Sequence, residues 1–200
     1  MRCVMNVTQA WCGVLIIVGS LLSVTGCSGY HTGKLDKKLR AKAVITGPGI
    51  SGEAYIHEEY EGRVRITLRL EGTPESKLNP GRHAIHIHET GNCASFSAAQ
   101  GHYDGNVDSS LNPDANVSPG LANHPYHLGD LPNLLVGEGR KGSLYTITNR
   151  VTISDGLTTL FDKDGSAFII HESEDKYLPD PPTKDAPGGA RIACGVIVKE

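Results

Sequence analysis

The sequence lacks an excess of positive charge, internal repeats and any long stretch with helical periodicity. Its 19 lysines and arginines are outnumbered by 22 acidic residues, so the formal net charge is -3 at pH 7. This balance gives no reason to expect nucleic acid as a partner, because nucleic-acid-binding domains carry basic patches. The 200 residues do contain 24 glycines, 11 prolines and many valines, isoleucines and threonines. Such a composition predicts one domain of β-structure with frequent turns.

The apolar run near the N-terminus is too short to span a membrane comfortably. It covers residues 11–24 and leads into Val-Thr-Gly-Cys, which resembles a bacterial lipobox. We therefore expect residues 1–26 to be a lipoprotein signal peptide and Cys27 to carry lipid. Residues 28–38 then form a polar tether, and residues 39–200 the functional domain. An uncleaved N-terminal anchor is the alternative; both place the domain in the bacterial cell envelope, on its periplasmic or outer-surface side.

Removal of the signal peptide leaves few cysteines. Cys3 and Cys12 leave with it and Cys27 is lipidated, so Cys93 and Cys194 are the remaining pair. In an oxidising compartment we expect these two to form a disulfide, with two free buried thiols as the alternative. The bond would close a loop of about a hundred residues and stabilise the fold by about 4 kcal/mol in the chain-entropy description.

Three of the nine histidines fall within residues 81–93, where they alternate with alanine and isoleucine. This alternation predicts a β-strand, in which successive side chains point to opposite faces. His86 and His88 then share one face and form a two-point clamp for a metal, whereas His83 points inward with the isoleucines. A strand with two solvated histidines is the alternative for this motif alone.

The stretch at 94–133 has little strand character and is rich in glycine, asparagine, aspartate, serine and proline. Its nitrogen and carboxylate groups suit a tetrahedral zinc site that would order the loop, with a polar loop carrying incidental histidines as the alternative. Those groups belong to His102, His124, His127 and Asp130. Elsewhere alternation and apolar runs predict strands at 39–45, 52–57, 64–70, 143–147, 150–154, 167–172 and 190–198.

Five motifs occur in one order along the chain, and in combination they are specific. They read Gly-x-His-x-x-His-x-His-Glu, Gly-His-Tyr, His-Leu-Gly-Asp-Leu, Ile-Ile-His-Glu and Gly-Gly-Ala-Arg-Ile-Ala-Cys-Gly-Val-Ile. From residue 39 to the C-terminus the chain thereby resembles the copper/zinc superoxide dismutases of the secreted bacterial type. The resemblance implies an all-β fold, an antiparallel eight-stranded Greek-key barrel or sandwich with two long functional loops.

The resemblance also assigns roles to individual residues. The implied copper ligands are His86, His88, His102 and His171. The implied zinc ligands include His127, Asp130 and again His102, which would bridge the two metals. Arg191 corresponds to the arginine that meets the substrate anion, and Asp175 to the carboxylate that links a copper histidine to a zinc histidine. Cys93 and Cys194 correspond to the family disulfide, and His83 to a histidine that binds no metal.

The sequence departs from the family pattern after His102. Tyr103 and Asp104 follow where Asn-Pro is expected, and Ser110 occupies the place of a third zinc histidine. The remaining histidine of this loop is His124, three residues before His127. We expect His124 to supply the third zinc nitrogen from a rearranged loop.

The implied function is conversion of superoxide to O₂ and hydrogen peroxide by copper redox cycling. Arg191 would dock the anion, and His102 would carry one of the two protons taken up. A copper-only dismutase with a decayed zinc loop, and a non-enzymatic envelope metal-binding lipoprotein, are the alternatives. Expected partners are superoxide and, through the N-terminal lipid, the membrane; the sequence is also compatible with a homodimer.

Replacement of His124 tests the departure from the pattern. His124→Ala should lower the zinc occupancy and the melting temperature while copper stays bound, because it removes one of four groups from a closed tetrahedral set. Metal content and thermal unfolding of the purified domain measure these effects. Full zinc retention by the variant would remove His124 from the site.

Overall fold

The computed structural model describes residues 39–60, 62–105, 127–178 and 185–200. The expected signal peptide, Cys27, the tether and His124 lie outside these residues, so the predictions made for them stay predictions. Within the described ranges, no helix has the length and apolar character that a membrane crossing requires.

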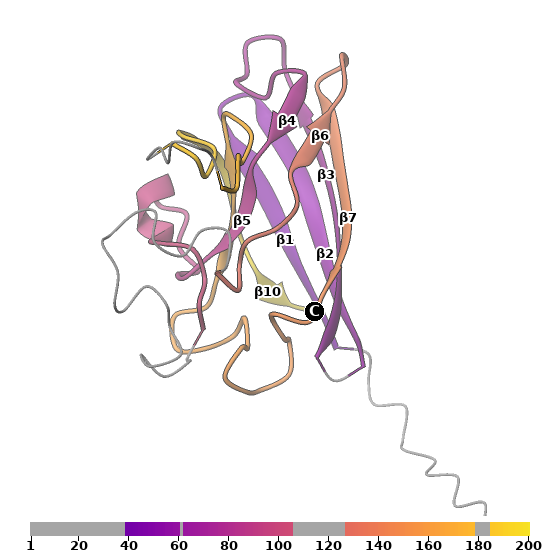
Figure 1. Cartoon of the computed structure of the whole chain (residues 1–200), viewed down its shortest axis with the longest axis vertical. Helices are drawn as coiled ribbons and strands as arrows, with labels where there is room; N and C mark the ends of the chain where they lie inside the picture. The colour runs from indigo at the N-terminus through magenta and orange to yellow at the C-terminus, as the bar shows by residue number, and fades with distance from the viewer. Residues whose placement is uncertain (1–38, 61, 106–126, 179–184) are drawn as a thin grey trace, which may run out of the picture. The chain divides into compact units, whose positions relative to one another are not determined.

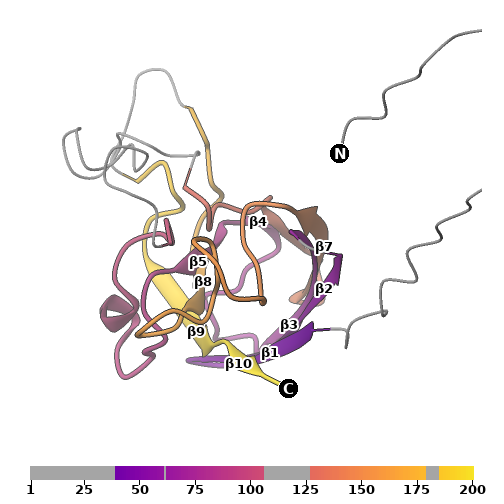
Figure 2. The same cartoon turned by 90° about the horizontal axis from the view of Figure 1, so that it is seen from below.

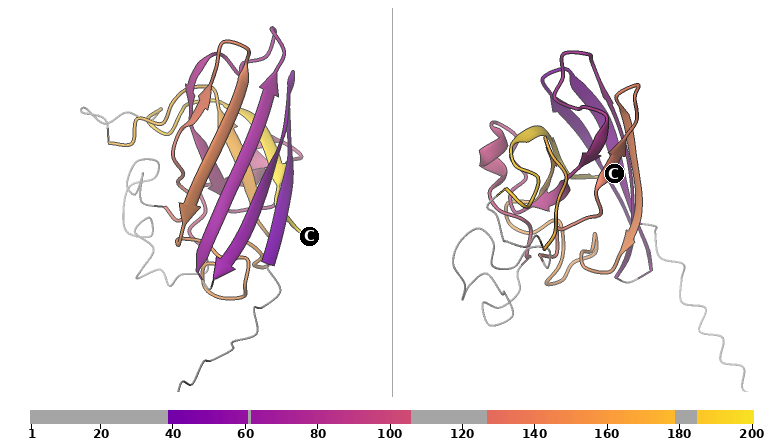
Figure 3. Two further views of the ribbon diagram at one scale, coloured as in Figure 1. Left: turned by 90° about the vertical axis from the view of Figure 1, so that its right-hand side faces the viewer. Right: turned by 45° about the horizontal axis from the view of Figure 1, so that its top comes forward.

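The described residues form strands and one short helical turn. The elements are β1 (Leu39–Gly47), β2 (Ile50–Tyr60), β3 (Arg63–Gly72), β4 (Gly81–His83), β5 (Ile85–His88), the 3-10 turn η1 (Phe96–Ala99), β6 (Leu134–Val136), β7 (Lys141–Thr148), β8 (Ala167–His171), β9 (Arg191–Val196) and β10 (Val198–Lys199). Figure 3 shows β1, β2, β3 and β7 side by side as a broad twisted surface. All ladder pairings between these strands are antiparallel.

The strand order is β4-β6-β7-β3-β2-β1-β9-β8-β5, and β10 pairs with β1. The two ends of this order, β4 and β5, are halves of one strand interrupted at Ala84, so the sheet curls into a nearly closed barrel (Figures 1 and 2). If β9 and β10 are also counted as one strand, the described part of the chain has the eight strands that the sequence predicts. Neighbours such as β1 and β9 are distant in sequence, as Greek-key crossovers require.

Alternating side chains build the barrel core. Along β1, Ala41, Ala43 and Ile45 are buried and the residues between them are exposed. β3 repeats the pattern, with Val64, Ile66, Leu68 and Leu70 facing the core. One face of each strand is therefore apolar and the other polar, as in antiparallel sheets that meet water on one side.

One predicted strand is wrong, and one observed strand was not predicted. Residues 150–154 form no strand, although Val151 and Ile153 are buried. They alternate because they cover the barrel as a loop, and the Glu58 carboxylate, in place of a neighbouring strand, accepts the amide of Ile153. β6 was not predicted, because its three residues are too few to show a period; it nevertheless pairs with both β4 and β7.

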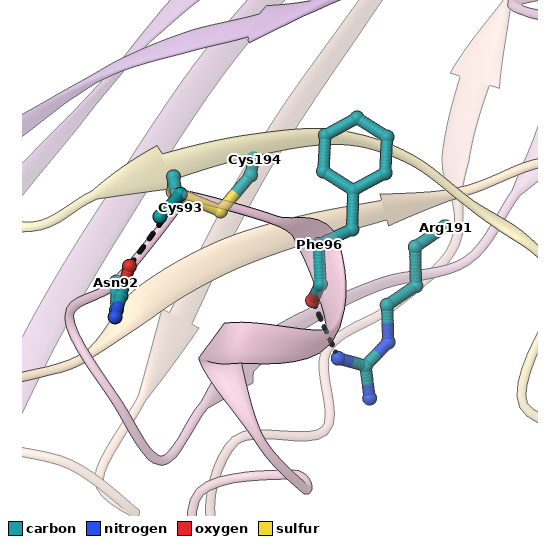
Figure 4. The surroundings of a disulfide bond; sticks show 6 residues. Asn92, Cys93, Phe96, Arg191 and Cys194 are labelled. Carbon is teal, nitrogen blue, oxygen red and sulfur yellow. Dashed lines mark hydrogen bonds between the residues drawn. A yellow bond between two sulfur atoms is a disulfide. The ribbon is translucent and has the colours of Figure 1, made fainter.

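The predicted disulfide between Cys93 and Cys194 is confirmed. It joins the loop after β5 to β9, across a sequence separation of 101 residues (Figure 4). The bond fixes the base of the segment that carries η1 to the barrel wall, next to β8 and β9.

Glu58 is a buried carboxylate, 6% exposed, that fastens the 153–154 segment to the end of β2. Its oxygens accept the amides of Ile153 (2.6 Å) and Ser154 (2.7 Å) and the Ser154 hydroxyl (2.7 Å). Burial alone would raise the pKa of Glu58, but the hydrogen bonds from Ser154 and Ile153 together lower it below its ordinary value. Because the pKa is lower in the folded state, this stabilisation is complete above the unfolded-state pKa and disappears as the pH falls through the lowered value.

Glu58→Gln should therefore lower the free energy of unfolding at pH 7 by about 1–3 kcal/mol, because it replaces charged hydrogen bonds at a buried position. It should also flatten the loss of stability between neutral and acidic pH. Urea unfolding across this range measures both effects, with Glu75→Gln at an exposed loop glutamate as the control. A pH profile parallel to that of the unmodified protein would contradict this role.

Candidate metal centre

His86 and His88 lie on β5, and all four residues of this strand are buried. Their shared face, predicted from the alternation, is fully buried, so these histidines are not solvated. β5 pairs with β8 through His86 opposite Ile169 and His88 opposite Ala167. β8 ends at His171, and the register of its pairing with β9 shifts between Ile170 and His171. This irregularity lies at the residue that faces the histidine pair.

Four histidines converge in a cluster, which we call the four-histidine cluster: His86, His88, His102 and His171. One ring nitrogen from each lies within 4.8 Å of the others. His86 Nδ1 and His171 Nε2 are 3.3 Å apart. His88 Nε2 is buried and, among the described residues, has no hydrogen-bond partner. A buried nitrogen without a partner is costly, and a metal ion at this point would satisfy it.

The other ring nitrogen of three of these histidines is oriented by a protein acceptor. His86 Nε2 lies 2.9 Å from an Asp175 carboxylate oxygen, and the side chains of both residues are fully buried. His88 Nδ1 faces the carbonyl oxygen of Gln100 at 2.9 Å. His171 Nδ1 faces that of Gly189 at 3.0 Å. Metal-binding histidines are held this way, since the acceptor fixes both the tautomer and the ring orientation.

Burial favours the neutral form of three rings of the cluster, those of His86, His88 and His171. Burial and, after it, the neighbouring His102 lower the pKa of His86 to about 4, against the opposing hydrogen bond to Asp175. Burial and the neighbouring His86 lower the pKa of His171 to about 3. The pKa of His88 also lies well below its ordinary value, first because of burial. Neutral imidazole is the form that binds metals, so these three rings need no deprotonation at neutral pH.

A second cluster contains His102, His127 and Asp130, which we call the carboxylate cluster. His102 Nδ1 lies 2.6 Å and His127 Nδ1 3.1 Å from the two oxygens of the Asp130 carboxylate. His102 belongs to both clusters, so one imidazole ring joins them. The ligands expected from the sequence are thus brought together, except His124, which lies outside the described residues.

Hydrogen bonds fix the turn that carries this second cluster. The His127 amide donates to the Asp130 carboxylate (3.0 Å), and the Asp130 amide donates to the His127 carbonyl oxygen (3.2 Å). The Arg150 guanidinium donates to the same His127 carbonyl. The two ligand-type residues therefore keep one geometry even though the turn has no regular secondary structure.

Arg191 begins β9 and is held beside the four-histidine cluster. Its guanidinium donates to the carbonyl oxygen of Phe96 at 2.7 Å (Figure 4) and to that of Gln100, also at 2.7 Å. The Gln100 oxygen also lies against His88, so one carbonyl links the arginine to a histidine of the cluster. Two fixed hydrogen bonds leave the planar cation in a defined position, suited to meeting a small anion.

Gln100 is a site residue that the sequence did not indicate. It has φ 64° and ψ −146°, a backbone region populated almost only by glycine. This conformation aims its carbonyl at both His88 and Arg191. No sequence signal could have identified it, because the functional atom belongs to the backbone.

An antiparallel barrel with two clusters of metal-binding groups that share one histidine defines a class of protein, the all-β metalloproteins with a two-metal centre. Residues 50–197 match the family described as copper/zinc superoxide dismutase (SODC), and the chain belongs to this family. Copper and zinc are accordingly its metals. The donor sets agree, since imidazole suits copper and a mixed nitrogen and oxygen set suits zinc.

Comparison with individual proteins of known sequence supports this family membership. The chain is 31% identical to a Cu-Zn superoxide dismutase 2 of Aquifex aeolicus over 187 residues, which cover 91% of this chain and 96% of the relative. It is 32% identical to a Cu-Zn superoxide dismutase of Legionella pneumophila over 188 residues, 92% and 96% of the two chains. Among solved structures, the clock protein EA4 shares the fold, with a TM-score of 0.61 and 24% identity over 80% of this chain and 94% of that one.

The strain at Gln100 can be tested directly. Gln100→Gly should raise the free energy of unfolding by about 1 kcal/mol, because glycine adopts the observed φ and ψ without steric cost. Chemical denaturation measures the change. Gln100→Ala is the matched control, since it removes the same side chain but keeps the strain; equal stabilities of the two variants would contradict the argument.

Proposed function

We propose that this chain dismutates superoxide to O₂ and hydrogen peroxide, with copper held by the four-histidine cluster and zinc by the carboxylate cluster. The observation that carries the assignment is that His102 belongs to both clusters. A single imidazole between two groups of metal-binding atoms suits a bridging ligand, because its two nitrogens point in opposite directions. The unpartnered His88 Nε2 supports a metal at the first cluster.

Copper, when bound, supplies the one-electron exchange with superoxide. The protein's own groups bind and orient the reactants. Arg191, held by two carbonyls, attracts the anion and places it next to His88. His102 carries at Nε2 one of the two protons that the reduced product takes up, while its Nδ1 faces Asp130. His102, His127 and Asp130 would hold zinc, which would supply a fixed point for the turn at His127 and for the His102 ring.

A protein that only stored metal would not require these surroundings. Asp175 orients His86 from a fully buried position, which exposed or weakly ordered metal-binding sites lack. Arg191 adds a cation beside the cluster, which repels metal ions and attracts anions. The arrangement therefore favours turnover of an anionic substrate over metal buffering.

The proposal includes a place in the cell envelope. The lipobox-like sequence ending at Cys27 supports lipidation of that cysteine after removal of residues 1–26, with residues 28–38 as the tether to the membrane. The disulfide between Cys93 and Cys194 supports an oxidising compartment. Globomycin treatment of producing cells, followed by mass measurement of the N-terminus, tests the anchor.

The proposal also includes a homodimer. Tyr55 on β2 and Tyr145 and Ile147 on β7 expose large side chains on the two strands that flank β3, and such apolar surface supports pairing of two copies. Light scattering of the soluble domain decides between monomer and dimer.

His171→Ala tests the copper assignment. The substitution should abolish dismutation while the fold and the zinc content persist, because it removes one nitrogen of the four-histidine cluster but neither the disulfide nor the carboxylate cluster. Metal analysis, circular dichroism and the rate of superoxide decay measure these three properties. His57→Ala, on the outer face of β2, is the matched control.

Activity of His171→Ala within a few-fold of the unmodified protein would reject the copper assignment. Absence of activity in the unmodified protein, loaded with both metals, would reject the function itself.

A further inference from the structure

Asn133 makes three hydrogen bonds to a segment 42 residues away in sequence. Its side-chain amide donates to the carbonyl oxygen of Asp175 (2.9 Å) and accepts the backbone amide of the same residue (2.8 Å). Its own backbone amide donates to the Tyr177 hydroxyl (3.1 Å). One side chain therefore pairs with both polar backbone groups of Asp175, as a neighbouring strand would.

The segment held in this way carries the carboxylate that orients His86. One Asp175 oxygen lies 2.9 Å from His86 Nε2, and the other accepts the Tyr177 amide at 2.6 Å. Tyr177 has φ 56°, a left-handed conformation that costs free energy in a residue other than glycine. Such a conformation persists only where the surrounding contacts determine it, and Asn133 provides two of these contacts to Asp175 and one to Tyr177.

On its other side, Asn133 is close in sequence to the carboxylate cluster. It follows Asp130 by three residues and directly precedes β6. Asp130 in turn forms an isolated antiparallel bridge with His86. Asn133 thus connects the turn with His127 and Asp130 to the loop with Asp175, and both of these segments meet at His86.

We propose that Asn133 is a positioning residue for the reaction. By fixing the backbone of Asp175, it holds the carboxylate against His86 Nε2 and so sets the direction of His86 Nδ1 within the four-histidine cluster. This inference rests on the proposed function and deepens it. Through Asn133, the geometry of the four-histidine cluster depends on the turn that carries the carboxylate cluster. A residue with a structural role alone would affect stability but leave the His86 ring in place.

The experiment compares Asn133→Ala and Asn133→Asp with the unmodified protein. The alanine variant loses both bonds to Asp175, whereas the aspartate variant keeps an acceptor for the Asp175 amide and loses the donor to its carbonyl. Asn149→Ala is the matched control, at an exposed asparagine after β7. Three quantities are measured: hydrogen exchange of the Asp175 amide in the metal-free protein, the electron paramagnetic resonance spectrum of the copper-loaded protein, and activity per bound copper.

We expect Asn133→Ala to speed exchange of the Asp175 amide at least tenfold, to change the copper hyperfine splitting, and to lower activity per copper by about tenfold, as loss of an outer partner of a metal ligand does. Asn133→Asp should protect the Asp175 amide better than alanine does, yet still alter the copper spectrum. Asn149→Ala should match the unmodified protein in all three.

A lowered melting temperature with an unchanged copper spectrum and unchanged activity per copper would overturn the inference and leave a structural role only. If Asn133→Ala does not fold, the copper spectrum of Asn133→Asp decides, and an unchanged spectrum overturns the inference. If the unmodified protein holds both metals but shows no activity, the proposed function fails; amide exchange and the copper spectrum then still decide the role of Asn133.

Discussion

Desolvation of the histidine rings is the constraint on which the rest of the site depends. Burial holds the pKa of His86 and His171 near 4 and 3, so these rings are neutral and able to bind metal. Neutral buried imidazoles still need partners for both nitrogens. Protein acceptors satisfy one nitrogen each of His86, His88 and His171 and leave the other directed at a common point. The barrel and its loops therefore serve to exclude water while supplying a small number of well-placed acceptors.

The loops take their order from the barrel through backbone contacts. Ile87 on β5 accepts the amide of Tyr103 (2.9 Å) and donates to the carbonyl of Gly129 (2.9 Å), and the Gly129 amide donates to Tyr103 (2.8 Å). These three bonds stack the loop residues next to His102 and His127 against the strand that carries His86 and His88. A Cβ atom on Gly129 would lie 2.2 Å from the Ile87 carbonyl oxygen, so glycine is required at this contact. The close approach brings the two clusters together.

Sequence patterns predicted the side-chain directions that follow from strand periodicity. They missed the parts of the site that are made by backbone atoms. The alternation at 81–93 predicted the common face of His86 and His88 and the inward direction of His83, which is buried against the carbonyls of Asn79 and His171. The disulfide followed from counting cysteines. In contrast, the carbonyl of Gln100 carries no side-chain signal, since every residue has one.

The errors in strand assignment have the same origin. Val151 and Ile153 alternate because they pack over the barrel, yet no strand pairs with them in a ladder within the described residues. A segment with one buried face shows alternating apolar residues whether or not it pairs with a neighbouring strand. Helical turns, loops and short strands such as β6 are determined by tertiary contacts that a single sequence does not display.

The interruption of one strand at Ala84 has a consequence for how the chain folds. β4 pairs with β6 and β5 pairs with β8, so closure of the barrel joins residues 81–88 to partners at 134–136 and 167–170. Both pairings close long loops, whose entropic cost falls on the folding rate more than on final stability. The β1–β2–β3 meander contains only local hairpins and can form early. His86 and His88 on β5 are therefore joined to His171 on β8 by a non-local pairing, so these metal-binding groups meet only where the chain has closed this part of its barrel.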